Sequence, residues 1–162
     1  MIYVSTCHNP WANIAYEEYL MNQVRPGDFN LYLWQNHHTV VIGKNQNAWR
    51  ECDWKRLEED GGYLMRRPSG GGAVYHDLGN LCFTMVTDRK QFDLPKQFSF
   101  VVAVLAFLGL SATFSGRNDI LVQEKKVSGN AFTLREDRAV HHGTLLVSTD
   151  MKMCIRDSCK SC

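Results

Sequence analysis

The sequence predicts an α+β fold, in which a mixed and mainly antiparallel sheet carries packed helices. Short runs of alternating or β-branched residues, separated by turn signals, fill most of the chain, whereas two longer segments show helical spacing. The runs after the second long helical segment are joined by short turns, which favours antiparallel pairing. With 162 residues, 44% of them hydrophobic and 22% charged, the chain has the size and composition of one globular domain.

The N-terminal part is expected to contain one helix between strands. Asn9 and Pro10 form a typical helix start, because asparagine caps the first turn and proline fits its first position. Apolar residues recur at helical spacing to about Val24, after which residues 25–28 give a turn signal. Alternating and β-branched side chains predict strands at residues 2–5, 29–34 and 39–42.

The remaining elements follow from the same two patterns. A short helix over residues 53–60 should end at the glycine pair 61–62. A long helix over residues 95–110 contains the most apolar run of the chain; that run is shorter than the roughly 20 residues of a membrane span, so we expect a buried helix. Strands are expected at residues 63–67, 72–76, 81–87, 112–115, 120–123, 131–135 and 140–148. Core positions include Phe83, Phe107 and Phe132.

The most informative segment is the run from Arg66 to Asn80, RRPSGGGAVYHDLGN. Three consecutive glycines let backbone N–H groups approach a ligand closely, and a turn of such groups forms an anion-binding concavity. The two arginines add planar charged groups that suit phosphate or carboxylate. The run matches neither the P-loop nor the dinucleotide fingerprint. It predicts a cradle for a phosphate-bearing ligand, with a tight hairpin turn as the alternative.

Charge and cysteine content argue against several classes of partner. The formal net charge is +1, which gives no general attraction to nucleic acid or to an anionic membrane. The first residues show no basic segment followed by an apolar run, so we expect no secretory signal, a cytoplasmic location and free thiols. Cys154, Cys159 and Cys162 are closely spaced, but no second pair of ligands accompanies them, and we expect no zinc site.

Five motifs, in order along the chain, are similar to those of the lipoate–protein ligases. They are residues 41–49, 66–80, 115–120, 126–132 and 141–146. The resemblance covers roughly residues 2–150 and implies a biotin/lipoate ligase-like catalytic domain. Residues 151–162 show no periodicity and no such likeness. We therefore expect a truncated, incomplete catalytic domain over residues 1–150, followed by a non-native or disordered tail.

The resemblance implies an ATP-dependent ligase that uses ATP and Mg²⁺. Such an enzyme activates lipoate, or octanoate, to the acyl-AMP with release of pyrophosphate. It then transfers the acyl group to a lysine of lipoyl acceptor domains, in the E2 subunits of 2-oxoacid dehydrogenases and in the glycine cleavage H protein. The alternatives are a biotin–protein ligase, an inactive ligand-binding fragment, and an ATP-independent octanoyl or lipoyl transferase. Transferases of this fold use a cysteine, and this chain has none between Cys82 and Cys154.

The same resemblance assigns the residues of the site. Lys126 is implied to be catalytic, in contact with both the acyl carboxylate and the α-phosphate of ATP, although its neighbours alone indicate an exposed lysine in a turn. The other residues implied for ATP are Arg67, Gly72, Ala73, Val74 and Tyr75. Those implied for lipoate, besides Lys126, are Gly71, His76 and His142. Further pocket candidates are Ser69, Gly70, Asp77, Asn80, Asn118 and Asp119.

Three of these positions leave alternatives open. His76 with Asp77 suits a general base, but adenylation starts from an ionised carboxylate, so a structural role is favoured. His141 and His142 are neighbours in a predicted strand and should point to opposite faces, which disfavours a shared metal ion. Asp119 suits either a turn motif or a Mg²⁺ ion bound with ATP, and the resemblance favours the ion.

Overall fold

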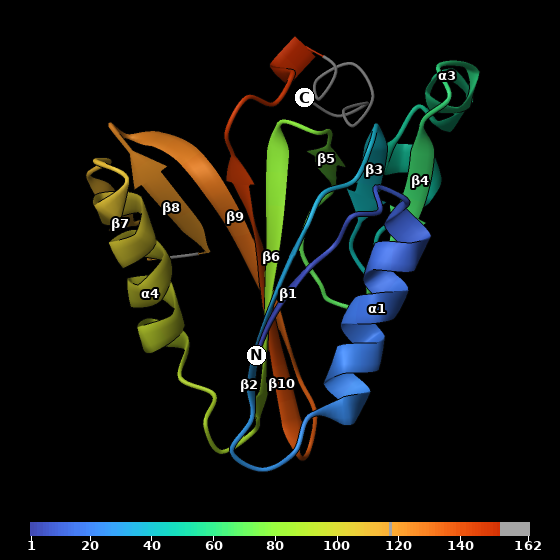
Figure 1. Ribbon diagram of the computed structural model, residues 1–162. Helices are drawn as coiled ribbons and strands as arrows, with labels where there is room; N and C mark the ends of the chain where they lie inside the picture. Colours follow the sequence, from blue (N-terminus) through green and yellow to red (C-terminus); the bar gives the residue numbers. More distant parts are fainter. Residues whose placement is uncertain (117, 153–162) are drawn as a thin grey trace.

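The computed structural model describes residues 1–116 and 118–152, which form two sheets flanked by helices (Figure 1). The strands of the larger sheet are β1 (Ile2–Val4), β2 (Phe29–Trp34), β6 (Asn80–Asp88), β7 (Ala112–Phe114), β8 (Asp119–Val122), β9 (Lys125–Leu134) and β10 (Arg138–Leu146). Their order is β1-β2-β6-β10-β9-β8-β7; β1 and β2 run parallel, and the other neighbours are antiparallel. The predicted α+β class with a mainly antiparallel sheet is confirmed. Arg117 and residues 153–162, and with them the three C-terminal cysteines and nearly all of the predicted tail, lie outside the described residues.

The smaller sheet carries the end of the glycine run. Its strands are β3 (Thr39–Ile42), β4 (Tyr63–Arg66) and β5 (Val74–His76), in the order β4-β3-β5. Helices α2 (Ala48–Glu51) and α3 (Trp54–Glu59) connect β3 to β4, and Leu57 of α3 packs in a core cluster with Val40, Ile42 and Tyr75. The sequence did not predict α2, a single turn that Asn47 caps by accepting the backbone N–H of Trp49.

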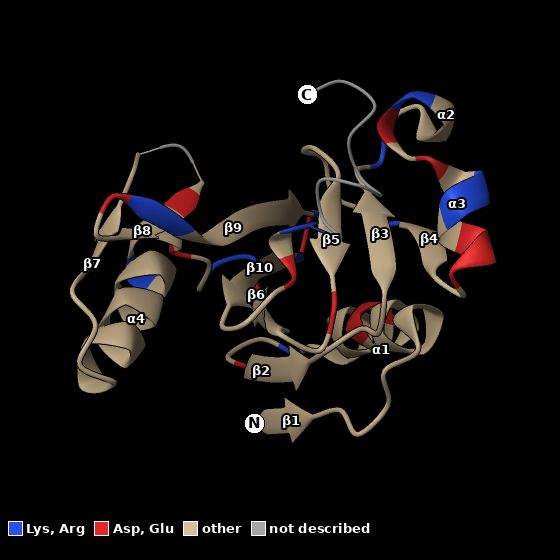
Figure 2. Cartoon of the chain, turned by 90° about the horizontal axis from the view of Figure 1, so that it is seen from above, with Lys and Arg blue, Asp and Glu red and all other residues tan. Residues whose placement is uncertain are grey.

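The two long helices, α1 (Pro10–Gln23) and α4 (Leu94–Phe107), pack on opposite faces of the larger sheet. Alternate residues of β6 explain this arrangement, because successive side chains of a strand point to opposite faces. Cys82 and Val86 pack in one cluster with residues of α1, and Phe83 and Met85 pack in another with residues of α4. Figure 2, a view from above, also shows α1 beside the smaller sheet, where Trp11 packs against Tyr63 at a ring separation of 5.1 Å.

The prediction that the apolar helix is buried as a whole is wrong. Phe98, Val101 and Leu105 form the face that α4 turns to the sheet, whereas Phe107 is 91% exposed. A helix that packs on the outer side of a sheet buries only one stripe, so apolar residues off that stripe remain exposed. Phe83 is buried as predicted, but Phe132 is 40% exposed. No helix in the described part of the chain is long and apolar enough to cross a membrane.

Strand β9 begins at Lys125, six residues before the predicted start. A two-residue turn joins β8 to β9, and both of its residues, Gln123 and Glu124, have positive φ, +50° and +63°. Turns of this kind usually contain asparagine, aspartate or glycine, so Gln123 and Glu124 are a weak signal for the hairpin. The pairing shifts between Ile120 and Leu121, and the resulting irregularity lies opposite the start of β9. Lys126 therefore lies on a strand rather than in the predicted turn, beside an irregularity of the kind that often re-aims a side chain.

Candidate active site

A cavity of about 440 Å³ lies where the glycine run faces strands β9 and β10. Its lining joins segments that are far apart in the sequence, including parts of β2, β6 and α1. The predicted site residues that line it are Arg67, Gly70, Gly71, Gly72, Ala73, Val74, His76, Asn118, Asp119, Lys126 and His142. The fold thus brings most of the predicted residues to one place, although their binding roles stay predictions.

Four predicted residues do not line this cavity. Tyr75 is buried in the core of the smaller sheet, and Asn80 is buried at the start of β6. Asp77 stabilises a turn instead, since its carboxylate accepts the backbone N–H groups of Gly79 and Asp150. Ser69 lies behind the lining, between Arg67 and His142.

Several lining residues were not predicted, and most of them come from strands. Trp34 and Cys82 belong to β2 and β6, where periodicity indicates burial but cannot identify a ligand pocket. Asn130 and Thr144 lie inside the motifs 126–132 and 141–146, so the motifs themselves were a usable signal. Glu17 lies behind the cavity on the inward face of α1, and no local pattern in the sequence marks it as a functional carboxylate.

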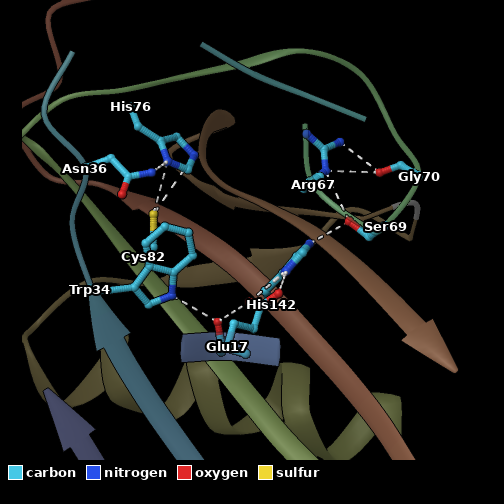
Figure 3. Close-up of polar contacts among 10 residues, drawn as sticks. Glu17, Trp34, Asn36, Arg67, Ser69, Gly70, His76, Cys82 and His142 are labelled. Carbon is cyan, nitrogen blue, oxygen red and sulfur yellow. Dashed lines mark hydrogen bonds and ion pairs between the residues drawn. The ribbon is translucent and has the colours of Figure 1, made fainter. Parts of the chain in front are cut away.

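Arg67 shapes the glycine loop from the inside (Figure 3). Its Nη2 donates to the carbonyl oxygens of Gly70 and Gly72, both at 2.8 Å, and its Nη1 donates to that of Val41 at 3.2 Å. In a planar trans peptide the N–H points opposite to the C=O. The N–H groups that follow these carbonyls, those of Gly71 and Ala73, therefore point away from the guanidinium. This is the arrangement that an anion-binding loop needs.

Arg66 holds the neighbouring loop in a similar way. Its Nη1 donates to the carbonyl oxygens of Gly43, Lys44 and Gln46, at 2.7 to 3.1 Å. Both arginines before the glycines thus bind loop carbonyls. From the sequence we expect charged groups turned to a ligand, whereas in the structure they also organise the backbone that faces the cavity.

Lys126 supplies a cation at the wall formed by β9. Its Nζ lies 2.9 Å from the carboxylate of Asp119, and both side chains are partly exposed. Gly129 leaves room for this side chain, because a Cβ there would lie 3.3 Å from Lys126 Cε. Within the described part of the chain, no cluster of three or more His, Cys, Asp or Glu side chains is placed to hold a metal ion. Asp119 is a single carboxylate beside the cavity, which suits Mg²⁺ that brings phosphate and water ligands with it.

His76 is buried against the cavity beside the thiol of Cys82. Asn36 Nδ2 donates to its Nδ1 at 3.2 Å, and Cys82 Sγ lies 3.5 Å from the same nitrogen. Burial, with the nearby charges of Arg67 and His142, lowers the pKa of His76 to about 3. Its imidazole is therefore neutral at physiological pH and is no longer a poised general base, which agrees with the structural role that we favoured.

Acidification should destabilise the protein through His76. An unfolded histidine titrates near 6.5, and the pKa of folded His76 is about 3. Between these values the unfolded state binds a proton that the folded state does not, so stability rises with pH. We expect a loss of about 2 kcal/mol between pH 7 and pH 5 that is absent from a His76→Gln variant. Denaturant unfolding of both proteins at each pH measures this; an identical pH dependence would contradict it.

The two adjacent histidines of β10 face opposite sides of the sheet, as predicted. His141 contacts Gln97 and Asn130, each at 3.0 Å, and burial lowers its pKa to about 4. His142 lines the cavity; its Nδ1 lies 3.1 Å from a carboxylate oxygen of Glu17, and its Nε2 lies 2.7 Å from Ser69 Oγ. The two rings have different partners and do not form a metal site.

Comparison with known sequences identifies the family. The family model for the lipoyl protein ligase A/B catalytic domain matches residues 9–157. Lipoate-protein ligase A of Psychrobacter cryohalolentis is 47% identical over 148 residues, which are 91% of this chain and 44% of that protein. The protein of the same name from Blochmanniella floridana is 44% identical over 151 residues, 91% of this chain and 45% of its own. The chain thus spans a little less than half the length of these relatives.

Solved structures show the same fold. P. falciparum LipL1 in complex with lipoate has a TM-score of 0.91 at 35% identity, over 98% of this chain and 51% of that one. A bipartite lipoate protein ligase from Thermoplasma acidophilum, described with its E2 lipoyl domain, has a TM-score of 0.90 at 33% identity, over 99% and 66%. A lipoate-protein ligase A bound with ATP has a TM-score of 0.85 at 32% identity, over 95% and 69%. From the family match, the sequence identity and the shared fold, we conclude that this chain belongs to the family of lipoyl protein ligase A/B catalytic domains.

Proposed function

We propose that this chain carries the catalytic site of an ATP-dependent lipoate–protein ligase, which activates lipoate or octanoate as the acyl-AMP. The observation that carries the proposal is a single cavity lined by both an anion-binding glycine loop and the cation of Lys126. Relatives of 32–35% identity that share the fold are described with lipoate and with ATP. The apolar side chains of Ile14, Trp34 and Val41 in the same lining suit an acyl chain.

The first step needs positioning and charge stabilisation rather than a strong base. An oxygen of the acyl carboxylate attacks the α-phosphorus of ATP; the new C–O–P linkage forms, the bond to the β-phosphate oxygen breaks, and pyrophosphate leaves. Lys126 lowers the repulsion between the two anions and stabilises the charge that develops on phosphorus. The N–H groups of the glycine loop are proposed to hold phosphate oxygens. Asp119 would hold Mg²⁺, which would neutralise phosphate charge.

The second step transfers the acyl group to a protein. The amine of an acceptor lysine attacks the acyl carbon, an amide forms, and AMP leaves. We propose lipoyl domains of E2 subunits as acceptors, in keeping with the Thermoplasma ligase and its E2 lipoyl domain, and the glycine cleavage H protein as a further acceptor. A catalytic domain over residues 1–150 and a cytoplasmic location stay predictions.

The cysteine-dependent transferase is less well supported. Among the residues that line the cavity, the one cysteine is Cys82. Burial raises the pKa of its thiol well above the usual range, and the pKa of its neighbour His76 is about 3. Such a pair does not form the thiolate and imidazolium that an acyl-transferring cysteine needs.

Lipoate-dependent release of pyrophosphate from ATP, with the mass of a lipoyl domain followed in the same reaction, tests the proposal. We expect pyrophosphate together with a lipoyl mass increment on the acceptor. The matched reaction contains an octanoyl carrier protein and no ATP. Transfer in that reaction alone would establish the transferase, and no product in either would indicate a fragment that binds ligand without turnover.

A further inference from the structure

A chain of buried polar side chains runs from helix α1 to the glycine loop, and the proposed chemistry does not use it (Figure 3). It begins at the carboxylate of Glu17, which is 3% exposed on the sheet-facing side of α1. It continues through His142 of β10 and Ser69 to the guanidinium of Arg67. A charged group this deep in a domain is costly unless every hydrogen bond is made, so its partners should reveal its role.

The contacts toward the loop form one continuous series of hydrogen bonds. Arg67 Nε–H can only donate, and Ser69 Oγ accepts it at 3.1 Å. Ser69 Oγ lies 2.7 Å from His142 Nε2, and His142 Nδ1 lies 3.1 Å from Glu17; with the ring proton on Nδ1, the Ser69 hydroxyl donates to Nε2 and Nδ1–H donates to Glu17. The series ends at the ionised carboxylate of Glu17, which is acceptor-only.

A second branch reaches the same carboxylate from the core. Trp34 Nε1–H donates to Thr84 Oγ1 at 3.0 Å, and the Thr84 hydroxyl donates to Glu17 Oε2 at 2.7 Å. Burial acts to raise the pKa of Glu17, but His142, Thr84 and Arg67 together hold it below its usual value. Glu17 is therefore a carboxylate in the folded protein and receives donors from both branches.

The first series, from Glu17 through His142 and Ser69 to Arg67, is called the loop branch here, and the series from Trp34 through Thr84 to Glu17 is called the core branch. The loop branch restrains Arg67, the side chain that shapes the glycine loop. Arg67 sets the direction of the glycine-loop N–H groups by holding the carbonyl oxygens of Gly70 and Gly72. Its Nε–H is shared between Ser69 Oγ at 3.1 Å and the Gly70 carbonyl at 3.2 Å, so losing Ser69 removes the side-chain partner that fixes this edge of the guanidinium. Ser69 in turn is held by His142, whose ring is oriented by Glu17. Partners behind a functional group commonly fix its orientation in this manner.

We propose that Glu17 is a positioning residue for the glycine loop: through His142 and Ser69 it fixes Arg67, and Arg67 directs the loop N–H groups toward a phosphate of the nucleotide. The inference rests on the proposed function for the identity of the phosphate, whereas the ordering of the loop does not depend on it. If Glu17 has this role, the affinity for the nucleotide depends on a side chain of α1 that does not line the cavity.

Three single substitutions test this role. Ser69→Ala and Glu17→Gln interrupt the loop branch, whereas the matched control Thr84→Val removes one buried hydroxyl from the core branch only. We expect the calorimetric Kd for ATP to rise about tenfold in the first two variants and to stay within about twofold in the control. We also expect the ¹⁵N order parameters of the loop glycines to fall from about 0.85 to below about 0.6 in the first two variants only.

The outcomes separate the positioning role from simple destabilisation. We expect thermal unfolding to show a lower melting temperature for all three variants. A loss of stability alone therefore does not separate the two test variants from the control, whereas a role in ordering the loop does. Unchanged ATP affinity and order parameters in Ser69→Ala and Glu17→Gln would overturn the proposal, as would equal losses in Thr84→Val. If the unaltered protein binds no ATP while the order parameters follow the expected pattern, the proposed function fails and the positioning role stands.

Discussion

Replacing Lys126 with alanine should slow lipoate-dependent pyrophosphate release by about 10²–10³-fold while leaving the fold intact. The side chain lines the same cavity as the glycine loop, and in the proposed reaction it supplies a cation where two anions meet. Its ion pair with Asp119 is partly exposed, so losing it should cost at most about 1 kcal/mol of stability. Steady-state pyrophosphate release, with thermal unfolding as the measure of fold, decides this prediction.

The neighbouring residue offers a matched control. Lys125 precedes Lys126 on β9, is exposed, and is not among the residues that line the cavity. A Lys125→Ala variant loses the same charge from the same strand and should release pyrophosphate at the normal rate. Normal release by Lys126→Ala, or an equal loss in both variants, would refute the assigned role.

Replacing Gly43 with alanine should weaken ATP binding about a hundredfold and destabilise the protein by about 1–3 kcal/mol. A Cβ at this position would lie only 2.1 Å from the carbonyl oxygen of Gly71. Backbone atoms cannot move aside as the end of a flexible side chain can, so the glycine loop must shift. The shift would strain the hydrogen bond from the Lys44 N–H to the Ser69 carbonyl, which joins the two loops at 2.9 Å.

Gly70 provides the comparison for stability. A Cβ there would meet no atom within 4 Å, and the residue does not have the positive φ that favours glycine. The free energy of unfolding of Gly70→Ala should therefore lie within about 0.5 kcal/mol of that of the unaltered protein. Calorimetric ATP titration and denaturant unfolding test both variants. If Gly43→Ala binds ATP normally and is as stable as Gly70→Ala, the close approach of the two loops is needed neither for ATP binding nor for stability, and the prediction is wrong.

Local signals in the sequence predicted what depends on neighbouring residues. The Asn9 side chain caps α1 as expected, accepting the backbone N–H groups of Trp11 and Ala12. The alternation over residues 29–34 became β2 with the predicted bounds. The glycine run forms a loop at the cavity wall, as expected from three adjacent residues without a Cβ, which leave the backbone free to take conformations such as the positive φ of Gly71. Where the local signal was weak, as in the Gln123-Glu124 turn, the start of β9 was missed.

By itself, then, the sequence determined the α+β class, most of the strands and the segments that meet at the cavity. Only the tertiary structure decided how charged groups are used there. The Glu17 carboxylate is hydrogen-bonded to His142 although 125 positions separate them, and Arg67 is turned to loop carbonyls rather than to solvent. A buried polar side chain takes its role from the partners that desolvation forces it to find. Those partners come from other strands and helices, so no local pattern in the chain can name them.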